Sequence, residues 1–170
     1  MRRIGGPSDG KGTESMDSEL VEAWRINVRT NEQLLDALPD EGLAARYSER
    51  TRTVAAQFAH LHNVRLSHLE RRGGGAPSST KSFPRGAQPT RAQLEKALRV
   101  SDKAIAALLA EVAESGKVKS WGPRPTSFLG YLLAHEAHHR GLALVSLRLS
   151  GIKLPKDFTH GLWYWSKKLG

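Results

Sequence analysis

Apolar residues recur at helical spacing in four separate segments of this 170-residue chain. Residues three or four positions apart share one face of a helix, so a stripe of this kind predicts a helix with one buried side. We predict helices over residues 17–38, 51–71, 90–115 and 126–150. The sequence shows no segment with the strict alternation typical of a strand. The pattern therefore predicts an all-α protein, a four-helix bundle.

Residues at the ends of these segments support the predicted boundaries. Thr90 with Gln93 three positions later fits a capping box at the start of the third helix. Thr126 or Ser127 is a suitable N-cap for the fourth helix.

The segments outside the helices have different compositions. Residues 1–15 are glycine-rich and nearly free of large apolar side chains, so we predict a disordered N-terminal tail followed by one domain over residues 16–170. Residues 72–89 form a long, basic loop rich in glycine and proline, which can cross the length of a bundle and is the segment best suited to contact a polyanion.

A short aromatic segment is predicted near the C-terminus. Trp163, Tyr164 and Trp165 follow one another there, after Pro155. We expect these rings either to pack against the bundle, in a short fifth helix, or to form an interface with another chain.

The fourth predicted helix carries the most informative polar residues. His135 and His139 lie one turn apart on its apolar stripe, whereas His138 lies off the stripe. Two imidazoles at this spacing can converge on one metal ion inside a helical bundle. Two hydrogen-bonded core histidines are the alternative, but the paired spacing favours a metal site.

The second predicted helix offers three further histidines. His68 lies nearest the centre of its stripe, and His60 and His62 flank the stripe on opposite sides. Helical geometry alone does not decide which of the three faces the fourth helix.

Composition narrows the chemistry. The chain has no cysteine, which excludes disulfides, thiolate ligands and a cysteine nucleophile, so a metal must be held by nitrogen and oxygen ligands. No apolar run approaches the roughly 20 residues of a membrane span, and the N-terminus lacks the apolar core of a secretory signal. We therefore expect a cytoplasmic protein without membrane contact. The net charge of +9 raises nucleic acid as a partner, but the basic residues are spread along the whole chain, which makes that partner an unfavoured one.

The sequence His135-Glu136-Ala137-His138-His139 also matches the HExxH motif of zinc proteases. The extended protease motif requires glycine at 142 and histidine at 145, where this chain has Leu142 and Val145. Glu136 would also point to one side of the two histidines. A protease is therefore disfavoured.

Several segments together resemble the DinB-like (damage-inducible) family of metal-binding four-helix bundles. The resemblance covers roughly residues 17–168, and the segments that carry it are QFAHLHNVRL (57–66), HEAHHRG (135–141), LRLSGIKLP (147–155) and GLWYW (161–165). The resemblance implies that one histidine of the second helix joins the pair of the fourth helix around zinc or nickel. Matched by position, the implied ligands are His60, His135 and His139, with His62 or His68 as alternatives to His60. The family often has glutamine at the position of Leu142.

The resemblance also implies a range of functions. Some members are metal-dependent thiol transferases or isomerases that use a low-molecular-weight thiol. We therefore expect a divalent-metal-binding protein, and as one hypothesis a metal-dependent enzyme, thiol transferase-like or hydrolase-like, in stress or detoxification, with a homodimer as one option. Two alternatives are a metal-binding bundle without catalysis and a basic nucleic-acid-associated protein of a damage response. Around the metal we expect Glu136, Asn31 or Asn63 to orient the ligating rings.

Overall fold

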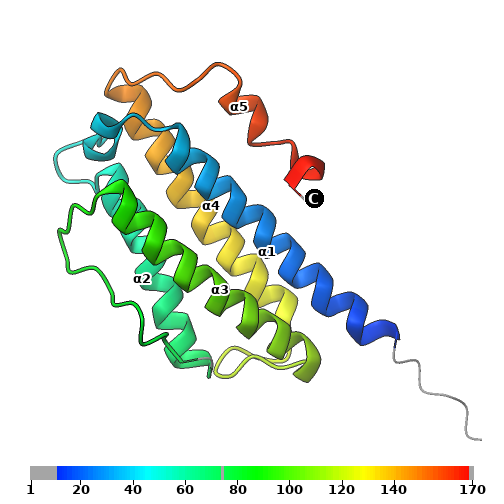
Figure 1. Ribbon diagram of the computed structural model, residues 1–170. Helices are drawn as coiled ribbons and strands as arrows, with labels where there is room; N and C mark the ends of the chain where they lie inside the picture. Colours follow the sequence, from blue (N-terminus) through cyan, green and yellow to red (C-terminus); the bar gives the residue numbers. More distant parts are fainter. Residues whose placement is uncertain (1–10, 74, 169–170) are drawn as a thin grey trace, which may run out of the picture.

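Four long helices make up most of the protein (Figure 1). The computed structural model describes residues 11–73 and 75–168. The long helices are α1 (Lys11–Ala37), α2 (Val54–Arg72), α3 (Arg91–Ser115) and α4 (Pro125–Leu149). Within these described residues there are also three short elements: the 3-10 helix η1 (Asp40–Ala44), the single turn α5 (Phe158–Gly161) and the 3-10 helix η2 (Trp165–Lys168).

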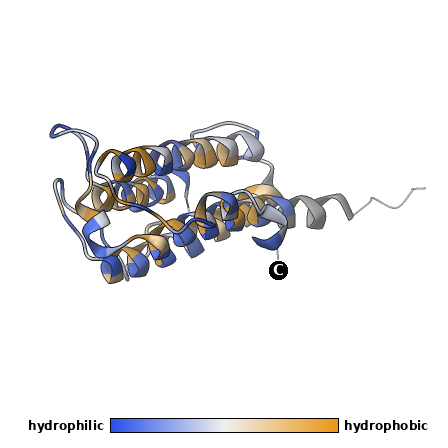
Figure 2. Ribbon diagram, turned by 90° about the horizontal axis from the view of Figure 1, so that it is seen from above, coloured by the Kyte–Doolittle hydropathy of each residue, from blue (hydrophilic) through white to orange (hydrophobic). Residues whose placement is uncertain are grey.

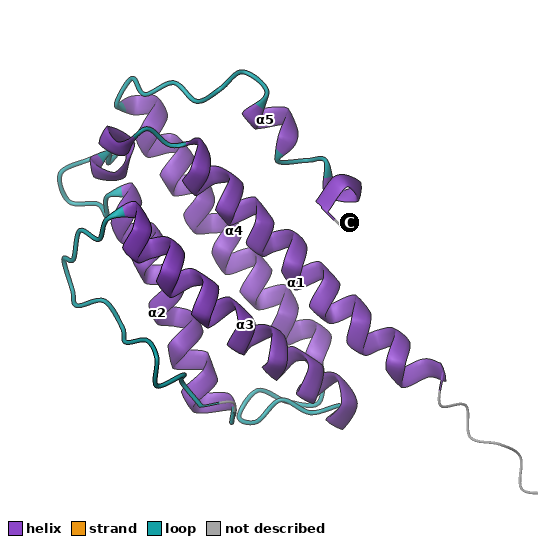
Figure 3. Ribbon diagram, viewed as in Figure 1, coloured by secondary structure: helices purple, strands orange, loops and turns teal. Residues whose placement is uncertain are grey.

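The predicted all-α four-helix fold is confirmed. Figure 3 shows helices joined by loops, and over the described residues the extended pairing amounts to one isolated bridge between Val118 and Gly122. In the same part of the chain, no helix combines the length and the apolar character needed to cross a membrane.

Short-range signals explain where most of these helices begin and end. The Thr53 side chain accepts a hydrogen bond from the Ala56 amide at the start of α2, and Thr90 and Gln93 form the predicted capping box at the start of α3. Gly116 follows α3 in the left-handed conformation that favours glycine. The predicted cap of α4 at Thr126 or Ser127 was wrong. This helix begins at Pro125, whose fixed φ suits the first helical position.

The first helix begins earlier than the sequence pattern predicted. The structure places α1 from Lys11 onward, so residues 11–15 are helical rather than part of a tail. Residues 1–10 lie outside the described residues, and a disordered tail there stays a prediction. The apolar pattern missed the first turns because the residues from 11 to 16 carry little apolar content.

The helices run up, down, down and up along the bundle (Figure 1). α3 packs against α1 and α2, and α4 packs against the same two helices. The long loop over residues 75–90, hereafter the crossover loop, returns the chain along the whole bundle. The residues that precede α2 and α3 consequently lie at the same end of the bundle, where Thr53 Oγ1 donates a hydrogen bond to Gln88 Oε1 (2.7 Å). The second and third helices are neighbours, but they are parallel.

Two apolar clusters fill the bundle. One surrounds Trp24 and Phe128 toward the end where α4 begins, and the other surrounds Leu34 and Phe58 at the opposite end. Figure 2 shows how hydrophobic and hydrophilic positions alternate around each helix. Between the two clusters lies a layer of buried polar side chains, and the candidate site lies at this level.

The C-terminal segment lies over α1 and α4. Lys168 Nζ donates a hydrogen bond to Thr30 Oγ1 of α1 (3.3 Å) and another to the carbonyl oxygen of Leu162 (2.8 Å). The predicted short aromatic segment is present, with a helical turn at α5. Its rings remain largely solvent-accessible: Trp163 is 75% exposed, and Tyr164 and Trp165 are about half exposed.

Candidate metal centre

The packing of α2 against α4 brings three histidines together. His135 and His139 lie one turn apart on α4, and His60 faces them from α2. The ring centroids of His60 are 5.3 Å from His135 and 4.6 Å from His139, and the centroids of His135 and His139 are 4.6 Å apart. One nitrogen of each ring lies within 4.8 Å of the other two. This geometry lets three nitrogen ligands meet at one ion.

The other histidines of α2 lie elsewhere. His62 is buried under the crossover loop, where its Nε2 is 3.2 Å from the carbonyl oxygen of Lys81. His68 packs edge-on against the rings of Trp121, Phe128 and Tyr131. His138 is exposed, as predicted from its position off the apolar stripe. Of the three alternatives on α2, the structure therefore places His60 beside the pair on α4.

Burial favours the neutral form of the three clustered rings. Burial lowers the pKa of His60 to about 4 and that of His139 to about 3, and it also lowers the pKa of His135. The positive charge of Arg52 and the neighbouring histidines lower these pKa values further. A neutral imidazole keeps a free lone pair on one ring nitrogen, and this is the form that binds a metal.

Gln57 orients one of these rings. His139 Nδ1 lies 2.7 Å from Gln57 Oε1, so the ring donates its Nδ1–H to this buried amide oxygen. The bond fixes the tautomer and leaves the Nε2 lone pair of His139 free for a ligand. Sequence reasoning missed Gln57. Its signal was its position three residues before His60, which places both side chains on the same face of α2.

The predicted orienting residues have other partners. Asn63 exchanges hydrogen bonds with the backbone of Phe83, at 2.9 and 2.8 Å, and so attaches the crossover loop to α2. Asn31 donates to Glu136 (2.6 Å), on the side of α4 away from the histidines. The prediction that Glu136, Asn31 or Asn63 would orient the ligating rings was therefore wrong.

Glu136 is the centre of the buried polar layer. It is 2% exposed, and its carboxylate accepts hydrogen bonds from Arg65 of α2 at 2.7 and 2.9 Å. Asn27 (2.5 Å) and Asn31 of α1 donate to the same carboxylate. Arg65 also donates to the carbonyl oxygen of Leu98 in α3 (3.2 Å), so this network joins all four helices.

This environment keeps the carboxylate of Glu136 ionised and engaged in hydrogen bonds. Burial alone would raise the pKa of its carboxyl, but the charge and hydrogen bonds of Arg65, with those of Asn27 and Asn31, hold it below its usual value. The general base of a zinc protease must reach a water at the metal, whereas this carboxylate faces away from the histidines and is fully engaged. The HExxH interpretation therefore lacks its base in this protein.

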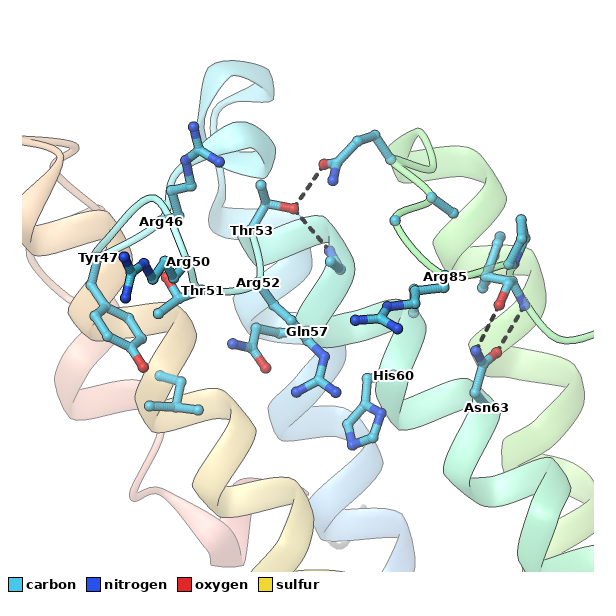
Figure 4. Close-up of a pocket in the computed structure, with 18 residues that line it drawn as sticks. Arg46, Tyr47, Arg50, Thr51, Arg52, Thr53, Gln57, His60, Asn63 and Arg85 are labelled. Atoms are coloured by element: carbon cyan, nitrogen blue, oxygen red, sulfur yellow. Dashed lines mark hydrogen bonds between the residues drawn. The ribbon is translucent and has the colours of Figure 1, made fainter.

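A pocket of about 830 Å³ opens beside the cluster (Figure 4). His60, Gln57 and Leu142 lie in its wall, together with residues of the 45–53 loop and the crossover loop. Leu142 occupies the position where the family resemblance leads one to expect glutamine. The pocket gives a small molecule access to His60.

Comparison with known families agrees with this geometry. The model of the DinB family matches residues 11–165. The chain belongs to the DinB family. No curated protein and no solved structure matches this DinB-family chain.

The residues present in this DinB-family protein fit a divalent ion. The donor set is three neutral imidazoles, a ligand type that suits zinc and nickel. Gln57 accepts a hydrogen bond from Nδ1 of His139, the ring nitrogen that would not bind the metal, as expected for a ligating ring. The three-histidine group could therefore hold a metal ion.

Proposed function

We propose that this DinB-family protein binds one divalent ion, zinc or nickel, through His60, His135 and His139. The observation that carries the proposal is the convergence of three histidine ring nitrogens within 4.8 Å of one another. Three protein ligands leave at least one coordination position open, which is the arrangement of a catalytic metal rather than a structural one.

The pocket beside His60 supports an enzyme, thiol transferase-like or hydrolase-like. The bound metal would act as a Lewis acid and lower the pKa of a thiol or water at its open position. The protein would contribute the fixed orientation of the three rings, through Gln57 and the packing of α4 on α2. The pocket would position a small substrate, with a low-molecular-weight thiol as the proposed co-substrate.

Two other functions are distinguishable from this one. A metal-binding bundle without catalysis would bind the same ion but transfer no thiol. The open pocket at His60 favours the enzyme, because a purely structural metal site is closed by four protein ligands. A nucleic-acid-associated protein would bind duplex DNA with an affinity that falls steeply as salt is raised.

The test combines metal analysis with an activity screen. The purified protein should contain or take up close to one equivalent of zinc or nickel, measured by mass spectrometry of the metal. His135→Ala should abolish this binding, and the matched control His138→Ala should retain it. The loaded protein should conjugate a low-molecular-weight thiol to electrophilic substrates. A protein that takes up neither metal at neutral pH would overturn the proposal, and full metal binding without any thiol transfer or hydrolysis would favour the non-catalytic bundle.

The proposal also extends to the cellular setting. We place the protein in the cytoplasm, in stress or detoxification, and we propose that it forms a homodimer. The half-exposed rings of Tyr164 and Trp165 support an interface of this kind. Light scattering on the eluting protein would measure its mass, and a monomer at micromolar concentration would contradict the dimer.

A further inference from the structure

Four arginines line the pocket beside the three-histidine group. Arg46, Arg50 and Arg52 belong to the 45–53 loop, and Arg85 belongs to the crossover loop. We propose that this pocket binds a small molecule with two or more anionic groups, carboxylates or phosphates, and holds its reactive end near His60. The reaction of that molecule rests on the proposed function above, whereas its binding through the arginines does not.

The charge of the pocket has no acidic counterpart. None of the residues in its wall is aspartate or glutamate. The two salt bridges of the described residues join Arg65 to Glu136 and Arg91 to Asp40, both outside this pocket. Arg46 Nη1 donates only a long bond of 3.3 Å to the backbone oxygen of Glu49. The four arginines are exposed to solvent around the pocket, where their like charges attract anions, and a ligand with several negative charges can pair with more than one of them.

The arrangement of the arginines suits a ligand that reaches the histidines. Figure 4 shows Arg52 and Arg85 extending from two different loops toward the space beside His60. The planar guanidinium group can bind a carboxylate or a phosphate with two parallel hydrogen bonds. A molecule held by both arginines would therefore lie next to the ring of His60.

Hydrogen bonds hold the two loops in place around the pocket. Thr53 bonds to Gln88 at 2.7 Å, which links the 45–53 loop to the end of the crossover loop. Asn63 bonds to the backbone of Phe83, two residues before Arg85. The arginines are thus presented by attached loops, which reduces the entropy lost when a ligand binds.

The shape of the site favours a small ligand over a nucleic acid. The volume of about 830 Å³ lies within the range of pockets for small molecules, roughly 300–1,000 Å³. The arginines lie on two loops around the pocket rather than along a helix that could enter a groove of DNA.

The proposal is tested by titration calorimetry on the full-length, metal-free protein. The probes are tricarballylate, a tricarboxylate, and pyrophosphate, with acetate as a monoanion, all at the same ionic strength. Using metal-free protein prevents the probes from binding a metal ion directly. At least one multivalent probe should bind at least tenfold more tightly than acetate, and the better of the two identifies a carboxylate or a phosphate ligand.

Charge-matched variants separate the pocket from the general field of a basic protein. The double substitution Arg52→Gln and Arg85→Gln should weaken binding of the better probe at least tenfold. The control, Arg99→Gln with Arg148→Gln, removes the same charge from exposed helical positions outside the pocket and should change binding less than twofold. Replacing Arg52 by lysine rather than by glutamine, in combination with Arg85→Gln, should restore part of the affinity. Lysine keeps the positive charge but loses the paired donors of the guanidinium group.

Three results would overturn the proposal. They are equal binding of acetate and the multivalent probes, equal weakening by the pocket and control substitutions, and displacement of the probe by duplex DNA at lower concentrations than by further probe. His135→Ala should lose metal binding and keep probe binding. Failure of the metal proposal and failure of the anion proposal are therefore separate results.

Discussion

Neighbouring residues on α4 have separate roles. His135 and His139 face α2 and His60, while Glu136, between them in sequence, faces Arg65 and the asparagines of α1. Successive residues of a helix point about 100° apart, so a single turn can serve a metal site on one side and a structural network on another. The hydrogen bond between His139 and Gln57 then determines which ring nitrogen is available.

Gln57→Leu should weaken metal binding without unfolding the protein. The substitution removes the acceptor for His139 Nδ1–H, and loss of a partner of this kind typically costs about 10–100-fold in metal affinity. Competition with a chromophoric chelator would measure the affinity. Gln33→Leu, at an exposed position of α1, is the matched control and should leave the affinity unchanged. Equal affinities for the two variants would show that Gln57 does not orient the ligand.

At the scale of the helices, the buried polar layer fixes how α4 lies against its neighbours. Apolar contacts are non-directional, whereas paired polar groups fix the position of one helix along another. Glu136 and Arg65 add directional contacts between α2 and α4, and Asn27 and Asn31 add contacts from α1. The level at which His60 meets His135 and His139 depends on this alignment.

Glu136→Ala should destabilise the protein strongly. It leaves Arg65 buried without its counter-charge, and removal of one partner of a buried ion pair costs about 3–5 kcal/mol. Urea unfolding followed by circular dichroism would measure the change. Glu111→Ala, at an exposed position of α3, should change the free energy of unfolding by less than about 0.5 kcal/mol. A loss for Glu136→Ala as small as that of the control would mean that the network adds little stability.

Much of the fold could be predicted from the sequence because helical periodicity and capping are local. The stripes located all four helices, and the Thr90–Gln93 capping box was recognised from its spacing. The predicted starts of three helices were misplaced: α1 begins at 11 rather than 17, α2 at 54 rather than 51, and α4 at 125 rather than 126. The first turns of α1 carry little apolar content, and the caps Thr53 of α2 and Arg124 of α4 were not recognised. The site was only partly predictable. The pair His135 and His139 follows from one helix, whereas the choice of His60 and the role of Gln57 depend on how two helices pack.

At the scale of the whole molecule, burial has made several histidines resistant to protonation. The pKa of His68 is lowered to about 4 by burial among aromatic rings, with Arg72 adding to the effect, and His60 and His139 are lowered as well. His60 and His139 belong to the candidate metal centre, whereas His68 contributes to the apolar cluster around Phe128. A fall in pH therefore affects histidines both in the candidate metal centre and in the apolar core.

The metal-free protein should lose stability as the pH falls from about 6.5 toward 4. In this window the unfolded chain binds protons on histidines that stay neutral in the folded protein, so protonation favours unfolding. The stability contribution is complete above about pH 6.5 and is lost as the pH approaches the folded values. Urea midpoints measured at intervals of half a pH unit would follow the loss. His68→Phe should flatten the profile, and an unchanged profile in this variant would contradict the assignment of His68.

The arginines of the pocket and the three histidines of the candidate metal centre belong to different kinds of structural element. The three histidines lie on long helices aligned by the polar layer, while the four arginines lie on two loops outside the bundle. Loops tolerate substitution far better than packed helices do. If the protein is the metal-dependent enzyme proposed above, its selectivity for a substrate and its reactivity at the metal would therefore be separable. Exchanging residues 45–52 and 84–87 for sequences of different charge would then redirect the same three-histidine centre to a different class of compound.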